Sequence, residues 1–203
     1  MAFRPFASIV IAYFLGSIPF ALLLARTWGT RDLHRLGSGN IGAANVFRAS
    51  GATAGMLVAA LDIGKGAAGV CFALRLGDSG PTSACAGLAA VVGHVYPIWL
   101  RFRGGKGVAT ACGAFAVLAP VAAIAACLIF AVGLWWTRYV SVGSVLASAA
   151  LAPVAYFTGS PEPVVVTALA AATLIVFRHR SNLARVRLGT ERRLRRRVQP
   201  REG

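Results

Sequence analysis

The chain is 203 residues long, 57% hydrophobic and only 13% charged, with a mean hydropathy of +0.69. Because a soluble domain carries about 25% charged residues, this composition excludes an ordinary soluble enzyme and indicates an integral membrane protein. At roughly 20 apolar residues per span, the chain has room for about six or seven short spans and no separate soluble domain.

The net charge of +15 is concentrated near the C-terminus, where ten arginines lie between Arg178 and Arg201. Such a tail is typical of proteins that bind nucleic acid or anionic lipid. In a multi-span protein it is better explained by the positive-inside rule, which places basic segments in the cytoplasm. The tail also lacks interleaved aromatic residues for stacking on bases, so we expect no nucleic-acid partner.

Seven apolar segments follow one another along the chain, and each is a candidate span. The first is longer than the apolar region of a signal peptide and has no clear cleavage site after it. The segments are residues 5–25, 51–76, 82–100, 108–119, 121–136, 142–158 and 164–177. No span repeats the motif of another, so no internal repeat is predicted.

The stretch 108–136 is too long for one straight span and is interrupted by Pro120. One kinked helix or two short spans both fit locally. Two crossings place Arg138 and the arginine-rich tail on the same side as Lys106, as the positive-inside rule requires. We therefore predict an all-α integral membrane protein with about seven transmembrane helices, N-terminus outside and C-terminus cytoplasmic.

The predicted organisation is a single membrane domain over residues 1–191, followed by a basic cytoplasmic tail, 192–203, that we expect to be disordered. The four cysteines lie inside apolar segments, form no CxxC pair and have no histidine close by in the sequence. We therefore expect neither a disulfide nor a metal site. The length and composition give no information on the oligomeric state.

Three polar segments, 26–50, 101–106 and 178–191, all fall on the predicted cytoplasmic face. The first carries Gly37, Ser38, Asn40, Asn45 and Arg48, a set that suits a ligand-wrapping loop, with arginine able to bind phosphate bidentately. A plain turn before a helix is the alternative, and the likeness to a dinucleotide GxGxxG motif is loose because no strand precedes it. One composite site built from the three segments is the simplest interpretation.

The second polar segment contains Gly104, Gly105, Lys106 and Gly107, preceded by His94. Glycines let backbone N–H groups approach an anion, and the lysine adds a charge. It is not a P-loop, because the residue after the lysine is not Ser or Thr. Taken alone, the segment fits an anion site or a cationic loop that only obeys the positive-inside rule.

In the third segment, His179 and Asn182 are spaced i, i+3 and share a face if the last span continues as a helix.

Asp62 and Lys65, also at i, i+3, lie within the second span. Ionisable residues inside a span usually pair or face a polar interior. They are therefore expected either to pair with each other or to lie at the edge of the site.

Carboxylates are scarce in the predicted cytoplasmic segments, which hold only Asp32, Glu191 and Glu202. This excludes a carboxylate pair for glycoside hydrolysis and a carboxylate cluster for magnesium. No acidic residue follows any histidine at HxxxxD spacing, so the arrangement of the common glycerolipid acyltransferases is absent. A cation-rich, glycine-rich site suits a reaction between phosphates, with developing charge stabilised electrostatically.

The three segments together resemble the signature motifs of the bacterial acyl-phosphate:glycerol-3-phosphate acyltransferases, the PlsY type. The motifs are GSGNIGAANVFR at 37–48, GHVYPIWLRFRGGKGVAT at 93–110 and RHRSNLARVRLGTE at 178–191, and the DIGKG at 62–66 also fits. The resemblance covers nearly the whole chain up to Glu191. Ala44 departs from the family, which usually has Thr there, and this puts any role of that side chain in doubt.

The resemblance implies that an acyl group is transferred from acyl phosphate to the 1-hydroxyl of glycerol-3-phosphate, giving lysophosphatidic acid and inorganic phosphate. This is the first acylation step of bacterial phospholipid synthesis, without a cofactor and with neither acyl-CoA nor acyl carrier protein as direct donor. It further implies seven spans in the bacterial inner membrane, with the active site at the cytoplasmic face among membrane lipids.

Residue roles follow at the positions that match the family's motifs. Arg48 and Lys106 are expected to bind phosphate, with N–H groups of 104–107 helping to hold acyl phosphate. His179 and Asn182 are expected to contact glycerol-3-phosphate near its reacting hydroxyl. The implied catalytic residues are Ser38, His179 and Asn182, and the implied substrate-binding residues are Gly37, Asn40, Asn45, Arg48, His94, Gly104, Gly105, Lys106, Gly107 and Glu191.

The general base is left open between two alternatives. A mixed anhydride is already activated, and proximity alone supplies about 7–11 kcal/mol in favourable cases, so a substrate phosphate oxygen can take the hydroxyl proton. In the other alternative His179 takes it. An acyl-enzyme on Ser38 is less favoured because nothing in the sequence activates that hydroxyl.

A small anion or lipid-phosphate transporter is the rival class of protein. Short spans interrupted by Gly and Pro and charges within the membrane favour it. The clustering of polar motifs on one face and the lack of a repeat favour the enzyme.

Overall fold

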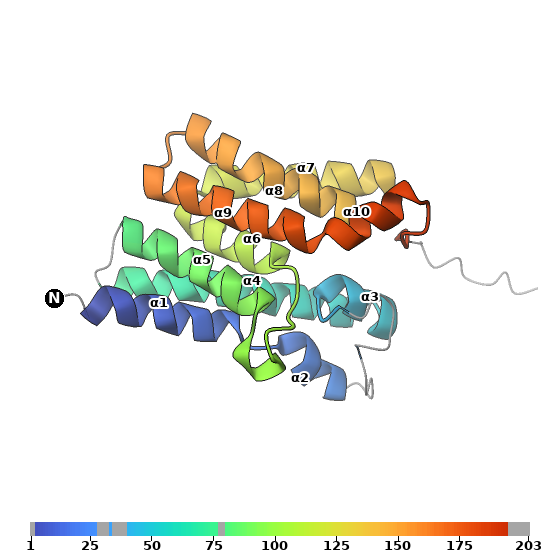
Figure 1. The fold of residues 1–203 in the computed structure, drawn as a ribbon, viewed down its shortest axis with the longest axis horizontal. Helices are drawn as coiled ribbons and strands as arrows, with labels where there is room; N and C mark the ends of the chain where they lie inside the picture. Colours follow the sequence, from blue (N-terminus) through green and yellow to red (C-terminus); the bar gives the residue numbers. More distant parts are fainter. Residues whose placement is uncertain (1–2, 28–32, 34–39, 77–79, 195–203) are drawn as a thin grey trace, which may run out of the picture.

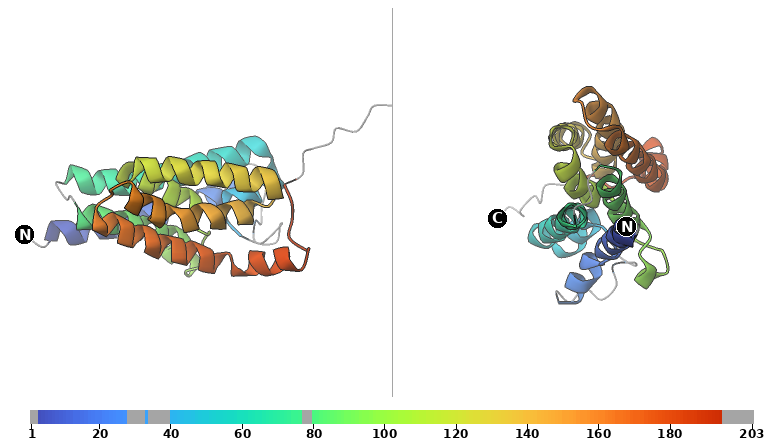
Figure 2. Two further views of the ribbon diagram at one scale, coloured as in Figure 1. Left: turned by 90° about the horizontal axis from the view of Figure 1, so that it is seen from above. Right: turned by 90° about the vertical axis from the view of Figure 1, so that its left-hand side faces the viewer.

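Figure 1 shows the computed structural model of the chain, which describes residues 3–27, 33, 40–76 and 80–194. Every regular element in these ranges is a helix, and the long helices lie side by side along one axis. Seen end-on in Figure 2, α8 and α9 lie on one side of the bundle, α1 and α4 lie on the other, and α5 and α6 lie between them.

The helices follow the predicted apolar segments closely. Their bounds are α1 Phe3–Gly16, α2 Phe20–Thr27, α3 Ala43–Ser50, α4 Ala52–Arg75, α5 Pro81–Val95, the 3-10 turn η1 Ile98–Leu100, α6 Val108–Leu118, α7 Pro120–Thr137, α8 Val140–Phe157, α9 Glu162–Arg178 and α10 Arg180–Arg187. α3, α10 and the loop that precedes α6 lie at one end of the bundle, which we call the polar end.

Five segments of the described chain are long and apolar enough to cross a membrane, and α9 with α10, bent by 51° at their junction, makes a possible sixth. α6 is a shorter apolar helix of 11 residues. At 1.5 Å per residue it is about 17 Å long, well short of a hydrocarbon core about 30 Å thick. The all-helical membrane fold is therefore confirmed, while seven crossings and the orientation of the termini stay predictions.

Two predicted spans are interrupted where the sequence has a proline. The first is broken between α1 and α2 at Ser17, Ile18 and Pro19, although the prediction treated it as continuous. The third was predicted to reach residue 100, but α5 ends at Val95 because the residue before Pro97 is disfavoured in helical conformation. Pro120 separates α6 from α7, as predicted.

The α4 and α6 helices pack backbone against backbone at two glycines. A Cβ atom built on Gly66 would lie 2.0 Å from the carbonyl oxygen of Thr110, and one built on Gly113 would lie 1.8 Å from that of Ile63. Close approach at small residues is the usual way in which membrane helices gain van der Waals contact. This contact fixes α6, and with it the loop that carries Lys106, against α4.

We expect Gly66→Ala to lower the thermal unfolding midpoint of the detergent-purified protein. The added methyl group has no space unless α4 and α6 separate, and overpacking of this kind costs about 1–3 kcal/mol. Gly64→Ala is the matched control, because a Cβ on Gly64 meets no atom of the described chain within 4 Å. Equal midpoints for the two variants would contradict the close α4–α6 contact.

Candidate active site

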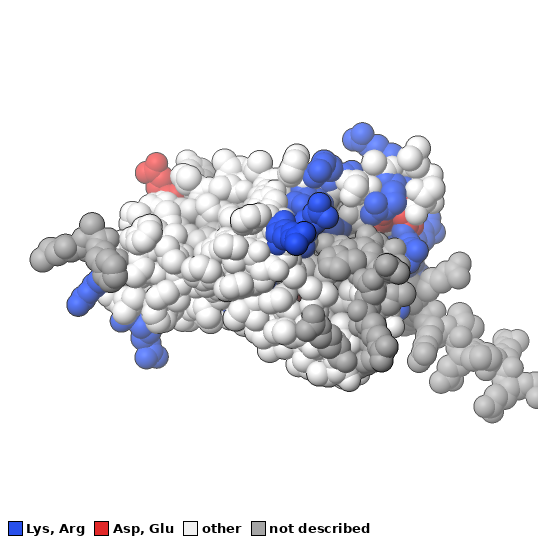
Figure 3. Space-filling view, turned by 60° about the horizontal axis from the view of Figure 1, so that its bottom comes forward, with Lys and Arg blue, Asp and Glu red and all other residues white. Residues whose placement is uncertain are grey.

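A cavity of about 470 Å³ opens at the polar end of the bundle and is lined by side chains from all three predicted site segments. Most lysine and arginine side chains visible in Figure 3 gather toward this end, while the flanks of the bundle are largely uncharged. The polar lining residues from the three segments are Asn40, Asn45, Arg48, Lys106, His179, Asn182 and Glu191, and the predicted His94 joins them from α5. The structure therefore brings these predicted residues together in one place.

A chain of hydrogen bonds links the second and third segments inside the cavity. The amine of Lys106 donates to Oδ1 of Asn182, whose Nδ2 donates to Oε1 of Glu191 over 2.7 Å. The other carboxylate oxygen, Oε2, accepts from Nε of Arg185, also over 2.7 Å. The lysine keeps two further N–H donors, so an anion in the cavity can bind to it while this network stays in place.

The surroundings of Lys106 change its acidity. Burial is the main reason that the pKa of its amine falls from 10.5 to about 8. The negative charge of Glu191 opposes this fall, and the positive charges of Arg185, Arg48 and Arg178 add to it. An anion bound beside the amine would favour the charged form, so binding and protonation are coupled.

His179 lies at the bend between α9 and α10 and is only 3% exposed. Its Nδ1 is 2.8 Å from the carbonyl oxygen of Ile175. Because a carbonyl can only accept, Nδ1 carries the proton and Nε2 of the neutral ring is an acceptor. The prediction that His179 and Asn182 share a face was conditional on a continuous helix, whereas the chain bends by 51° at His179. The two side chains still line the same cavity.

Arg48, on α3, supplies a second cation to the cavity. Its Nη2 donates to the carbonyl oxygen of Arg192 over 3.4 Å, and its buried Nε has no hydrogen-bond partner within the described part of the chain. A buried donor without a partner is costly, and an anionic ligand would satisfy it. Arg192 belongs to the predicted tail, whose residues 195–203 lie outside the described chain.

The N–H groups of Gly104 and Gly105, which were predicted to help hold phosphate, are bonded within the protein, and their role in binding stays a prediction. Their N–H groups donate to the carbonyl oxygens of Val95 and His94 over 3.0 and 3.1 Å. Their carbonyls accept from Nη2 of Arg178 over 3.2 and 3.3 Å. The glycines are needed for close packing of the loop against the end of α5, since a Cβ on either would collide with His94.

The remaining predicted residues divide into three cases. Gly107 lines the cavity, and its φ of 88° lies in the left-handed region that favours glycine. Asn45 lines it too, and its Nδ2 donates to the carbonyl oxygen of Leu33 over 3.2 Å, tying the first segment together. Gly37 and Ser38 lie outside the described residues, so their roles stay predictions.

Sequence reasoning missed three serines on α8 that line the cavity, Ser141, Ser144 and Ser148. Ser141 lies 3.4 Å from Oε1 of Glu191 and donates to it. The other two donate to carbonyls of their own helix. Their spacing of three and four residues puts them on one helix face, and this polar stripe in a predicted span was the available signal.

Away from the polar end, the cavity continues as an apolar groove. Four helices line it with mostly small side chains, so space is left between them. These residues are Met56, Ala59 and Ile63 on α4, Ala111 and Cys112 on α6, Ala123, Ala126, Cys127, Phe130 and Leu134 on α7, and Ala147 and Leu151 on α8. One cavity thus joins a cationic polar end to an apolar groove, which suits a molecule with an anionic head and a long apolar tail.

The fold defines a multi-span membrane protein whose cavity suits an amphipathic anion, and comparison with known proteins identifies its family. The chain matches the family model described as glycerol-3-phosphate acyltransferase over residues 6–189. It is 47% identical over 182 residues to a glycerol-3-phosphate acyltransferase of Roseobacter denitrificans, covering 90% of each chain. Over 197 residues it is 45% identical to one of Thermus thermophilus, covering 96% of this chain and 97% of the other.

Solved structures agree with this similarity. PlsY (YgiH), an integral membrane glycerol 3-phosphate acyltransferase, in its glycerol 3-phosphate form has a TM-score of 0.89 at 38% identity, covering 94% of this chain and 96% of that one. Its lysophosphatidic acid form has a TM-score of 0.87 at 36% identity, covering 94% and 95%. The chain therefore belongs to the glycerol-3-phosphate acyltransferase family and is a multi-span membrane protein.

We expect Glu191→Gln to lower the pKa of Lys106 below about 8, because the substitution removes the neighbouring charge that favours the protonated amine. The pH dependence of labelling by an amine-reactive reagent measures this value, and Lys65 and Lys106 are the two lysines of the chain. Glu162→Gln, at the opposite end of α9, is the control and should leave the midpoint in place. An unchanged midpoint in Glu191→Gln would refute the electrostatic coupling.

Proposed function

We propose that this protein transfers a fatty acyl group from acyl phosphate to the 1-hydroxyl of glycerol-3-phosphate, giving 1-acylglycerol-3-phosphate and inorganic phosphate. The observation that carries the proposal is the single cavity in which Arg48 and Lys106 lie at the mouth of an apolar groove. The two ends fit the head and the tail of an acyl phosphate. Family relatives named glycerol-3-phosphate acyltransferase support the acceptor.

The phosphate groups of the two substrates require positive charge, and the cavity offers it in two forms. Arg48 stays protonated at any physiological pH and presents its buried Nε. Lys106 is a point charge that titrates near pH 8. We assign both to phosphate binding. Gly107 opens α6, whose first N–H groups lack helical acceptors and add a favourable dipole for an anion.

In the proposed reaction, the 1-hydroxyl oxygen attacks the acyl carbonyl carbon and the bond from that carbon to the phosphate oxygen breaks. The hydroxyl proton passes to a phosphate oxygen of a substrate or to Nε2 of His179. The bond from Nδ1 of His179 to Ile175 supports the second route, because it leaves Nε2 as the acceptor. The first route is supported by the partner of Nδ1, which is a backbone carbonyl and not a carboxylate that would stabilise a charged imidazolium. Asn182 is expected to hold the acceptor beside Lys106.

We further infer a bacterial inner membrane protein with seven crossings and the site at the cytoplasmic face. The gathering of basic side chains at the polar end supports this orientation under the positive-inside rule. The short α6 counts as a crossing only together with the loop that leads into it.

The reaction itself is tested with detergent-purified protein given glycerol-3-phosphate and either acyl phosphate, acyl-CoA or acyl carrier protein as donor. We expect lysophosphatidic acid and an equal amount of inorganic phosphate with acyl phosphate only. If no lysophosphatidic acid forms with acyl phosphate, the proposed reaction is wrong. Product formed from acyl-CoA at a similar rate would reject the donor assignment alone.

His179→Gln distinguishes the two routes for the proton. If His179 is the base, kcat at saturating glycerol-3-phosphate should fall by about 10²–10⁴-fold, the usual contribution of general base catalysis. A largely retained kcat would instead assign the proton to a substrate phosphate. Thr167→Val, a buried substitution on the same helix but away from the cavity, controls for general damage to α9.

The rate should also depend on pH through Lys106. Its amine is charged below about pH 8 and neutral above, so kcat/KM for glycerol-3-phosphate should decline as the pH rises through that value. In Lys106→Arg the cation persists, and this alkaline decline should disappear whatever the absolute rate. A wild-type profile that stays flat up to pH 9 would remove Lys106 from phosphate binding.

A further inference from the structure

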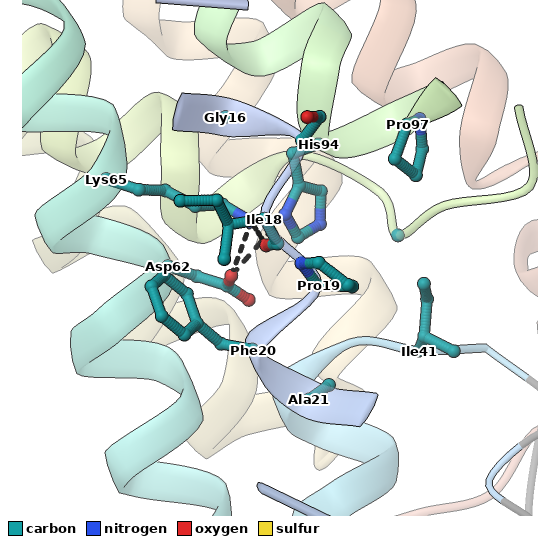
Figure 4. Close-up of a pocket in the computed structure, with 12 residues that line it drawn as sticks. Gly16, Ile18, Pro19, Phe20, Ala21, Ile41, Asp62, Lys65, His94 and Pro97 are labelled. Atoms are coloured by element: carbon teal, nitrogen blue, oxygen red, sulfur yellow. Dashed lines mark hydrogen bonds and ion pairs between the residues drawn. The ribbon is translucent and has the colours of Figure 1, made fainter. Parts of the chain in front are cut away.

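A buried charge cluster lies between the break in the first span and the loop that carries Lys106. Figure 4 shows Asp62, Lys65 and His94 pointing toward one another there. Lys65 Nζ is 2.8 Å from Oδ1 of Asp62, and Nδ1 of His94 is 3.6 Å from the same oxygen. The three residues are 2%, 5% and 8% exposed. Of the two alternatives left open by the sequence, pairing of Asp62 with Lys65 is observed, Asp62 also lines the cavity, and His94 is the third member of the cluster.

Lys65 connects this cluster to the break between α1 and α2. Its amine donates to the carbonyl oxygen of Ile18 over 2.8 Å. The adjacent Ser17 hydroxyl accepts from Nε1 of Trp99 over 2.8 Å, so the same break is also held against η1. The broken backbone of the first span is therefore fixed by α4 on one side and by the segment after α5 on the other.

His94 connects the cluster to the residue before Lys106. A Cβ built on Gly105 would lie 2.0 Å from Nε2 of His94, so the ring lies directly against the backbone of Gly105. The Gly105 N–H donates to the carbonyl oxygen of His94 over 3.1 Å. One ring nitrogen thus faces Asp62 and the other faces the loop. The ring is enclosed on both sides, which makes it unsuitable as a base for the substrate hydroxyl.

The energetics favour a positioning role for the cluster. Charges taken out of water pay a desolvation penalty that their mutual attraction often fails to recover, so a buried ion pair is weak grounds for stability. The Lys65 amine does impose direction, because its bonds to Asp62 and to the Ile18 carbonyl each fix an angle as well as a distance. Asp62 and His94 also line the large cavity, as Lys106 does.

We propose that Asp62, Lys65 and His94 form a positioning network that sets the place of Lys106 in the active site. Asp62 lies against the ring of His94 and pairs with Lys65, Lys65 holds the break in the first span, and the ring in turn packs against Gly105. The lysine that follows is thereby directed into the cavity toward Asn182. None of the three touches substrate in this proposal. It rests on the proposed function only for its kinetic consequence.

Two variants test separate links of the network. His94→Asn leaves the Asp62–Lys65 pair in place and withdraws the ring from Gly105. The double variant Asp62→Asn/Lys65→Met removes both charges together and leaves the ring without its carboxylate, avoiding an unpaired buried ion. Thr167→Val, buried on α9 and outside the cavity, is the control. Each variant is assayed in detergent at the same number of degrees below its own thermal unfolding midpoint as wild type.

The readout is the pH dependence of Lys106 labelling by an amine-reactive reagent, read peptide by peptide. In wild type the midpoint should lie near pH 8. In both variants Lys106 should label faster and with a midpoint displaced toward 10.5, because a loop without its anchor exposes the amine to water. In His94→Asn, Lys65 stays unlabelled and reports an intact bundle. The KM for glycerol-3-phosphate should rise by between about tenfold and a hundredfold, with a smaller change in kcat.

Wild-type labelling of Lys106 in folded His94→Asn would overturn the proposal, and so would a raised KM without a change in labelling. The control should match wild type in both readouts; if it also alters Lys106 labelling, the effect is general loosening and the proposal fails. If wild type makes no lysophosphatidic acid, the proposed reaction fails while the labelling result still decides whether the network positions Lys106.

Discussion

The structure depends on hydrogen bonds to the backbone carbonyl groups of non-helical segments inside an apolar bundle. Away from water, a carbonyl without a helical partner must be matched by the protein itself. Lys65 does this for Ile18 at the break in the first span, and Arg178 does it for Gly104 and Gly105 in the loop before α6. Cationic side chains from the spans therefore supply the hydrogen bonds that these irregular segments lack, and the loop before α6 carries part of the site.

The fold was largely predictable because each apolar segment is bounded by polar residues, Gly or Pro. Pro120 marked the division between α6 and α7 in the sequence. The break at Pro19 was missed because the apolar signal runs on through it, although a proline disfavours helical conformation in the residue before it. What no local pattern shows is the partner of the Ile18 carbonyl, which accepts from a lysine 47 residues away.

The meeting of three polar segments at one cavity was predictable from charge and span parity, because both place them at the same end of the bundle. The function of individual glycines in the second segment could not be predicted from the sequence. Gly104 and Gly105 permit a close approach, and the sequence does not distinguish a ligand from the protein's own backbone; here the partner is the end of α5. Two of the α8 serines, Ser144 and Ser148, were overlooked because they lie within a predicted apolar span, and Ser141 because it immediately precedes that span.

The shortness of α6 has a consequence for side reactions. α6 has 11 residues and α7, which runs back alongside it, has 18. At 1.5 Å per residue, the first residue of α6 lies about 10 Å deeper in the bundle than the last residue of α7. The groups around Gly107 therefore sit in a recess of the bundle. A mixed anhydride is open to attack by water as well as by an alcohol. If the donor is the acyl phosphate proposed above, restricted access of water to this recess would favour acyl transfer over hydrolysis of the donor.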